Sequence, residues 1–366
     1  MSKQRVIVAM SGGVDSSVAA GLLLRQGYEV IGVTMRLWTQ DDPAAPMHHR
    51  RCCSVEDTDD ARAAADALGI PHYVLNLERE FARDVVDYFV DEYRRGRTPN
   101  PCLACNQHVK FRSLLERASA LGAHYLATGH YARIDRRNGR HRLLRAVDGR
   151  KDQSYVLYTL GQRELSLLLL PVGHLRKERV RELAAEMGLP VADKPDSVDI
   201  CFITNNDYRT FIAGRVPQAE GDLVDADGRV VGRHRGIAGF TVGQRRGLGV
   251  ALGEPRFVTA VDSVRNVVTI GQEEDLLTTT LVAEDVRWVA GTPPSAELEA
   301  QVKIRYRTRA SPALVRAVGA TACVQFERPQ RAVTPGQAAV FYRGDEVLGG
   351  GIIASARGLD RRVLRD

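Results

Sequence analysis

The sequence of 366 residues predicts an α/β fold with a doubly wound parallel sheet, followed by a β-rich region that ends in a small β-barrel. Over roughly the first 200 residues, short apolar runs alternate with helical patterns, which is typical of parallel strands joined by helices. From about Asn205, glycine becomes dense and long helical patterns disappear. After Thr278, short segments of alternating apolar residues favour the strands of a barrel.

The first strand and the turn after it organise the amino-terminal half. Five consecutive apolar residues (6–10) predict a buried parallel strand, and Ser11-Gly12-Gly13 allows a sharp turn without a Cβ clash. A helix is expected to begin near Asp15 and to stop at Gly27. The amides of its first turn and the nearby serine hydroxyls would form a cradle for an anion, most plausibly phosphate.

The other elements of this half alternate in the same way. Strands are predicted at residues 29–34, 72–77 and 125–128, and helices at residues 54–69, 81–95 and 109–121. Ligands of such sheets bind beyond the carboxyl ends of the strands. The first turn, Met35 and Gly129-His130 all follow strand ends, and the polar loop 38–53 is expected to lie over the nucleotide site.

The rest of the chain gives weaker patterns. Asn138-Gly139 between two short runs predicts a β-hairpin, and residues 151–188 have a mostly helical pattern. Strands of the barrel are predicted at residues 298–306, 313–318, 322–326 and 338–342.

Charge and hydropathy limit the environment and the partners. The net charge is +6, and residues 133–151 hold eight basic residues against two acidic ones. This clustering predicts a polyanionic partner, unless it only reflects an arginine-rich composition. No apolar run approaches the roughly 18 residues of a membrane span, and the first residues lack the apolar core of a signal peptide. We therefore expect a cytoplasmic protein without a membrane association.

The turn after the first strand differs from the common ATPase loop, which carries a lysine for the outer phosphates. No lysine lies between Lys3 and Lys110. The motif SGGVDSS (residues 11–17) instead resembles the pyrophosphate loop of the ATP pyrophosphatases, which cleave ATP to AMP and pyrophosphate while adenylating a substrate. The resemblance implies ATP with Mg²⁺, and these ATP-binding residues: Ala9, Met10, Ser11, Gly12, Gly13, Val14, Asp15, Ser16, Met35 and Gly129.

Six cysteines in a chain of this length do not indicate a disulfide framework in a reducing compartment. Cys102 and Cys105 are expected in a loop (residues 96–106) stiffened by two prolines, and Cys201 borders an apolar patch. A C-x-x-C pair could be half of a zinc site, a redox pair or two incidental thiols. No second pair follows at zinc-finger spacing, so we assign no metal ligands.

Several motifs occur together in the order that is typical of one family. They are SGGVDSS, VTMRLW, CCSVEDTDDAR, GRTPNPCLACN, TGHYAR, KDQSYVLY, DSVDICFI and GFTVGQRRGLG. With them the chain resembles the tRNA-specific 2-thiouridylases over nearly its whole length. The resemblance implies an adenine nucleotide alpha hydrolase-like catalytic domain (residues 1–204), a small central domain (205–278) and a carboxyl-terminal β-barrel that binds tRNA (279–366).

This family replaces the C2 oxygen of the wobble uridine of certain tRNAs with sulfur. The resemblance implies that Cys201 carries the sulfur as a persulfide, and that Cys105 either attacks the persulfide, leaving a Cys105–Cys201 disulfide, or assists transfer directly. Many relatives have aspartate, a candidate general base, where this chain has Cys102. The third thiol keeps open a mechanism with an iron–sulfur cluster held by all three cysteines, which we do not favour. Cys52, Cys53 and Cys323 are interpreted as structural.

The resemblance also implies two partners, tRNA and a persulfide donor, either a cysteine desulfurase or a sulfur-relay protein. Gln244-Arg245-Arg246 resembles a turn that contacts the RNA backbone. The alternatives are another ATP pyrophosphatase that modifies tRNA or forms amides, and a metal-binding RNA-binding protein without catalysis. The residues that match tRNA-binding positions of the family are His130, Lys151, Asp152, Gln153, Arg305, Tyr306 and Gln337.

Overall fold

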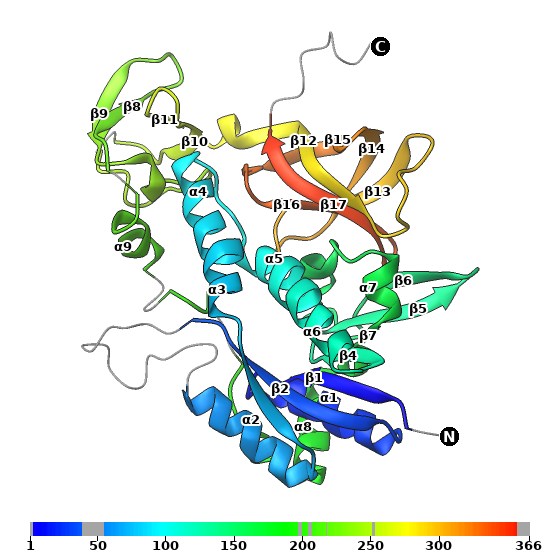
Figure 1. Ribbon diagram of the computed structural model, residues 1–366. Coiled ribbons are helices and arrows are strands. Elements are labelled where there is room, and N and C mark those ends of the chain that lie inside the picture. The colour runs from blue at the N-terminus through cyan, green and yellow to red at the C-terminus, as the bar shows by residue number, and fades with distance from the viewer. Residues whose placement is uncertain are drawn as a thin grey trace.

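The computed structural model describes residues 3–38, 55–196, 200–203, 207–216, 218–250 and 253–356 (Figure 1). Cys52, Cys53 and most of the loop 38–53 lie outside these ranges. Within them, no helix combines the length and the apolar character that a membrane crossing requires.

A five-stranded parallel sheet forms the centre of the amino-terminal domain, as the sequence predicts. Its strand order is β3-β2-β1-β4-β7. The chain adds β2 and β3 on one side of β1 and then returns to add β4 on the other side. The strand order therefore reverses between β1 and β4, the place where ligands bind in such sheets. The strands are β1 (Arg5–Ala9), β2 (Glu29–Arg36), β3 (His72–Asn76), β4 (Tyr125–Thr128) and β7 (Leu168–Leu169).

Helices cover both faces of this sheet (Figure 1). Successive residues of β1 point to opposite faces, so Val6 and Val8 pack in one apolar cluster and Ile7 and Ala9 in another. The first cluster is covered by α1 (Val14–Arg25), α2 (Val55–Leu68) and α8 (Lys177–Glu186). The second is covered by α3 (Glu78–Phe81), α4 (Tyr88–Arg94), α5 (Pro101–Ala104) and α6 (Leu115–Ala120), with π-helical segments at Ala82–Asp87 and Cys105–Leu114.

The cysteine pair lies in a helix, and the prediction of a loop for residues 96–106 is wrong in its second half. The side chain of Asn100 accepts a hydrogen bond from the Cys102 amide at 3.1 Å, and Pro101 occupies the first helical turn. Proline suits that position because its missing N–H is not needed there. Cys102 therefore lies in the first turn and Cys105 begins the next segment of the same continuous helix.

The segment 151–188 is mostly helical, as predicted, but it also contains the fifth strand, β7. Its helices are the 3₁₀-helices at Ser154–Leu157 and Pro171–His174 and the α-helices α7 (Gln162–Ser166) and α8. A strand of two residues is too short to give a recognisable pattern, so the sequence could not indicate it.

A small mixed sheet follows α9 (Tyr208–Ala213) and forms the central domain. Its strand order is β10-β11-β8-β9, and Leu223, Val258 and Val268 are among its buried residues. The strands are β8 (Gly221–Val224), β9 (Val230–His234), β10 (Phe257–Asp262) and β11 (Val267–Gly271).

The carboxyl-terminal domain is a closed six-stranded barrel, because β12 pairs with both β15 and β17. The predicted strands are present, and the structure adds β12 and β17, which the sequence patterns did not indicate. The strands are β12 (Leu277–Trp288), β13 (Leu298–Lys303), β14 (Ser311–Val318), β15 (Thr321–Arg331), β16 (Ala338–Arg343) and β17 (Glu346–Ser355).

The predicted hairpin joins the catalytic domain to this barrel. It consists of β5 (Ala132–Arg137) and β6 (Arg140–Arg145), and its turn residues Asn138 and Gly139 both have positive φ. Leu143 of β6 pairs with Val347 of β17, so the barrel sheet continues into the catalytic domain. The barrel is therefore held against the domain that carries the pyrophosphate loop.

We expect Leu143→Ala to destabilise this junction. Leu143 is fully buried, and such a truncation leaves a cavity that costs about 2–5 kcal/mol. Leu314→Ala is the matched control because Leu314 is 43% exposed in β14. Urea unfolding followed by tryptophan fluorescence measures both, and equal midpoints for the two variants would contradict the packing described here.

Candidate active site

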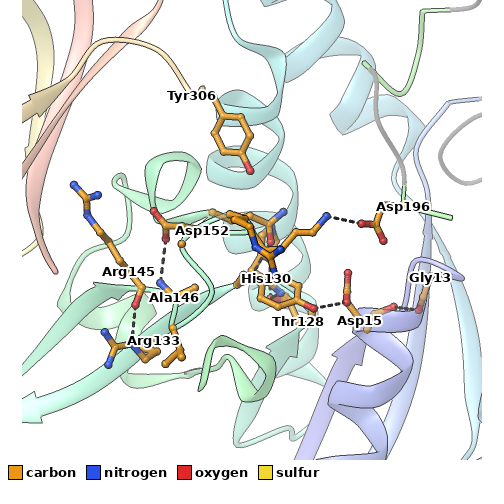
Figure 2. A pocket seen from close by; sticks show the side chains of 18 of the residues that line it. Gly13, Asp15, Thr128, His130, Arg133, Arg145, Ala146, Asp152, Asp196 and Tyr306 are labelled. Atoms are coloured by element: carbon orange, nitrogen blue, oxygen red, sulfur yellow. Dashed lines mark hydrogen bonds and ion pairs between the residues drawn. The ribbon is translucent and has the colours of Figure 1, made fainter. Parts of the chain in front are cut away.

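A cavity of about 1450 Å³ lies between the carboxyl ends of β1 and β4 and the barrel. The pyrophosphate loop forms one end, and residues 301–310 of the barrel form part of the other. Figure 2 shows Asp15 and Gly13 on the loop side and Tyr306 on the opposite wall, with His130 between them. The cavity therefore brings together segments that are far apart in the sequence.

The pyrophosphate loop is ordered by its own serines. The Ser11 amide donates to Ser16 Oγ at 3.1 Å, and the hydroxyls of Ser16 and Ser17 donate to the Gly13 carbonyl. Gly13 is the N-cap of α1 and has no side chain to cap the first-turn amides. Such a helix start attracts anions.

Two glycines permit close backbone approaches at this loop. Gly12 has φ +70°, and a Cβ there would lie 2.2 Å from the Asp57 carbonyl oxygen. A Cβ at Gly129 would lie 2.6 Å from the Ser16 amide nitrogen. The loop after β1 can therefore approach α2 so closely only because residue 12 is glycine, and the segment after β4 can approach the start of α1 only because residue 129 is glycine.

A buried lysine connects the loop to a second carboxylate. The Lys177 ammonium lies 2.7 Å from Asp15 and 2.8 Å from Asp196, and Asp15 also accepts a hydrogen bond from the Tyr131 hydroxyl. Lys151 contacts the other oxygen of Asp196 at 2.6 Å. Burial opposes ionisation of Asp196, but the hydrogen bonds from Lys151 and Lys177 prevail and lower its pKa to about 2. Asp196 is therefore ionised at neutral pH.

A second lysine reaches the loop from the same region. Lys194 donates to the Gly12 carbonyl oxygen at 3.0 Å and forms ion pairs with Asp57 and Asp60. Burial alone would lower the pKa of Lys194, but the two carboxylates raise it. Two lysines that are distant in sequence thus contact the loop, Lys177 at Asp15 and Lys194 at the Gly12 carbonyl.

Sequence reasoning missed Lys177 and Lys194. Lys177 is 162 positions from Asp15, and a lysine at the start of a helix carries no pattern of its own. Only the packing of α8 against α1 places it at the loop.

Most predicted ATP-binding residues line the cavity. They are Ala9, Met10, Ser11, Gly13, Val14, Asp15, Ser16, Met35 and Gly129. Gly12 contributes its carbonyl to Lys194 behind the loop instead of lining the cavity.

The residues predicted to bind tRNA divide into two groups. His130, Lys151, Asp152, Gln153 and Tyr306 line the cavity. His130 hydrogen-bonds with Thr128, and burial lowers its pKa well below the ordinary value, so its ring is neutral.

Arg305 and Gln337 are not among the residues that line the cavity. Arg305 donates to the Ala332 carbonyl at 2.7 Å, and Gln337 donates to the Thr98 carbonyl at 2.7 Å. The Thr98 amide also donates to the Pro335 carbonyl. Gln337 therefore holds the segment that leads into the cysteine helix.

The three cysteines differ in exposure. Cys105 is 7% exposed within the apolar cluster on one face of the sheet, and Cys201 is half-buried against the same cluster. Cys102 is exposed, and burial together with the charge of Asp152 raises the pKa of Tyr306. Cys323 is half-buried in β15. In the described part of the chain, no three His, Cys, Asp or Glu side chains are grouped as metal ligands.

Comparison with known proteins identifies the family. A family model described as "tRNA methyl transferase HUP domain" matches residues 4–205, and a curated protein of Carboxydothermus hydrogenoformans is 50% identical over 96% of this chain and 98% of its own length. That relative is named tRNA-specific 2-thiouridylase MnmA. The chain belongs to the tRNA-specific 2-thiouridylase family. The family resemblance and the fold class predicted from the sequence are thereby confirmed.

Further matches of this thiouridylase-family chain agree. A protein of Pelotomaculum thermopropionicum with the same name is 50% identical over 97% of this chain and 98% of its own length. Residues 209–272 match a "tRNA methyl transferase PRC-barrel domain" and residues 278–353 an "Aminomethyltransferase beta-barrel domain". A solved 4-thiouridine synthetase–RNA complex is 18% identical over 58% of this chain and 50% of its own, with a TM-score of 0.33, too low to support an argument.

We expect Gly12→Ala to weaken ATP binding by about 10-fold, which corresponds to 1.4 kcal/mol. The new Cβ would collide with the Asp57 backbone and displace the loop. Gly27→Ala is the matched control, because Gly27 also has positive φ but nothing lies within 4 Å of its Cβ position. Calorimetric titration with ATP compares the variants, and equal affinities would show that the close approach is unnecessary.

Proposed function

We propose that this protein catalyses ATP-dependent 2-thiolation of the wobble uridine of tRNA. The observation that carries the proposal is that one cavity joins the pyrophosphate loop to the basic wall of the barrel, in a chain of the thiouridylase family. A nucleotide at one end and an RNA base at the other would meet near His130.

The first step would be adenylation of the uridine. The C2 oxygen attacks the α-phosphorus of ATP, the bond to the β-phosphate oxygen breaks, and pyrophosphate leaves on the loop side. The first-turn amides of α1, with Lys177 and Lys194 nearby, would stabilise the negative charge that moves onto pyrophosphate. The C2 oxygen then departs as part of AMP, a far better leaving group than oxide.

Mg²⁺ fits this site only together with phosphate oxygens. Asp15 is the carboxylate of the loop, and the described side chains provide no complete set of ligands. Mg²⁺ commonly binds through one or two carboxylates and substrate phosphates, so Asp15 would hold it and the ion would neutralise phosphate charge.

The second step would transfer sulfur from Cys201. A desulfurase or relay protein supplies the outer sulfur of a Cys201 persulfide. The Cys105 thiolate attacks the inner sulfur, which forms a Cys105–Cys201 disulfide and releases hydrosulfide, and hydrosulfide replaces AMP at C2. A thiol reductant then reopens the disulfide. In the alternative, the outer sulfur of the persulfide attacks C2 and displaces AMP, and the Cys105 thiolate then attacks Cys201 Sγ, which releases 2-thiouridine and leaves the same disulfide. Packing of both cysteines against one apolar cluster supports their cooperation.

Cys201→Ser tests the sulfur step. We expect it to retain tRNA-dependent formation of AMP and pyrophosphate but to yield no 2-thiouridine, because the hydroxyl cannot carry sulfane sulfur. Cys323→Ser, in the barrel, is the control and should remain active. Anaerobic incubation with tRNA, ATP, Mg²⁺ and a persulfide donor, without added sulfide, followed by nucleoside mass spectrometry and an iron assay, gives the answer. Thiolation by Cys201→Ser would refute the persulfide role.

Lys177→Met tests the adenylation step. Removal of one charged donor at the pyrophosphate is expected to lower the rate of AMP formation by about 10²–10³-fold. Lys3→Met, at an exposed position outside the cavity, is the control. Single-turnover assays at saturating ATP measure the effect, and thermal melting checks the fold. A folded variant with the native rate would exclude Lys177 from this step.

A further inference from the structure

Four basic side chains gather at the barrel end of the cavity without acidic partners. Arg145, Lys303, Arg307 and Arg309 all line this end. Among the residues that the structure describes, no carboxylate forms an ion pair with any of them. By contrast, Lys151, Lys177 and Lys194 at the opposite end are each paired with aspartates.

The backbone of Arg145 is fixed, whereas its side chain lacks acceptors. Its amide donates to the Asp345 carbonyl at 2.8 Å, and its carbonyl accepts from Arg133 Nε at 2.7 Å. Its guanidinium lies 4.0 Å from the centre of the Tyr342 ring. The Nε and Nη2 atoms of this guanidinium are buried and have no hydrogen-bond partner within the described residues. This is the edge with which arginine commonly binds a phosphate through two hydrogen bonds.

Lys303 approaches from the barrel side. Its ammonium lies 5.7 Å and 5.6 Å from the ring centres of Tyr155 and Tyr306. Burial lowers the pKa of Lys303, Asp152 raises it, and the positive charge of Arg145 lowers it. Both oxygens of Asp152 already accept hydrogen bonds from local donors. Two cations thus lie close enough to repel each other, and a bound anion would relieve the repulsion.

We propose that Arg145 and Lys303 together bind one phosphodiester group of the RNA, next to Tyr306, whose ring offers a surface for a base. This rests on the proposed function and deepens it by naming where the backbone beside the target nucleotide is held. A phosphodiester fits because it is a narrow anion that can enter a recess between two domains. The proposal requires the Arg145 side chain to turn within its stack on Tyr342 so that its Nε–Nη2 edge faces the ligand.

The test is the salt dependence of tRNA binding. The variants are R145Q, K303Q, their combination and R145K, with R25Q as the control because Arg25 is exposed on α1, outside the cavity. Each phosphate contact contributes about 0.7–0.9 to the slope of log K against log salt concentration. Filter binding of an unmodified tRNA transcript between about 50 and 200 mM KCl gives the slope. Binding through phosphate contacts weakens strongly over this range of salt concentration.

We expect both single variants to weaken tRNA binding and the double variant to lose about 0.7–0.9 of the slope in total, since the two side chains share one phosphate. R25Q should keep the native slope. R145K keeps the charge but lacks the Nε–Nη2 edge, so it should keep the slope and still bind tRNA more weakly than the native protein. A loss of about twice that size in the double variant would mean two separate phosphates and would overturn the shared site. Native tRNA affinity in R145K would show that the guanidinium edge makes no contact and would overturn it as well.

Two further measurements separate this proposal from the proposed function. The affinities for ATP and pyrophosphate should be unchanged in R145Q and K303Q. If these variants bind ATP more weakly but bind tRNA like the native protein, the two side chains contact a phosphate of ATP, and the RNA subsite is overturned. Thiolation of the transcript by the native protein tests the proposed function itself. A native slope in the double variant, when the native protein thiolates tRNA, would refute only the subsite.

Discussion

One buried ammonium group determines how the two halves of the site are arranged. Lys177 is 6% exposed and lies between Asp15 of the pyrophosphate loop and Asp196, which precedes Cys201 by five positions. A buried charge is tolerated only when it is paired, so both carboxylates must remain close to this lysine. The bridge therefore ties the loop 11–17 to Asp196, in the segment that follows α8.

The barrel forms part of the wall of the cavity. Strand β17 of the barrel pairs with β6 of the hairpin in the amino-terminal domain. This pairing fixes the position of the cavity wall that the barrel forms. Arg97 connects Glu92 of α4 to Glu284 of β12 at 2.7 and 2.6 Å, and Gln337 holds Thr98 from the barrel side. These contacts lie immediately before the cysteine helix. The position of Cys102 and Cys105 thus depends on a domain that follows them by more than 170 residues.

Much of the site could be predicted because its chemistry is local. The loop 11–17 forms hydrogen bonds within itself, and the positive φ of Gly12 is a property of the turn. The cysteine helix was mistaken for a loop because Pro99 and Pro101 read as helix breakers, although proline fits a first turn. The family resemblance predicts that Arg305 and Gln337 bind tRNA. In the structure, however, each side chain donates a hydrogen bond to a backbone carbonyl, Arg305 to Ala332 and Gln337 to Thr98.

The sequence alone determined the parallel sheet, the pyrophosphate loop and the family, because apolar periodicity, turn residues and ordered motifs are properties of short segments. Only the tertiary structure decided which lysines contact the loop 11–17, and which basic side chains lie without an ion pair at the barrel end of the cavity among the described residues. Lys177 reaches Asp15 of the loop through the packing of α8, and Lys194 reaches Gly12 because the chain returns after α8. Arg145 reaches the cavity through the pairing of β6 with β17. Such long-range placements follow from how whole elements pack, and no local pattern encodes them.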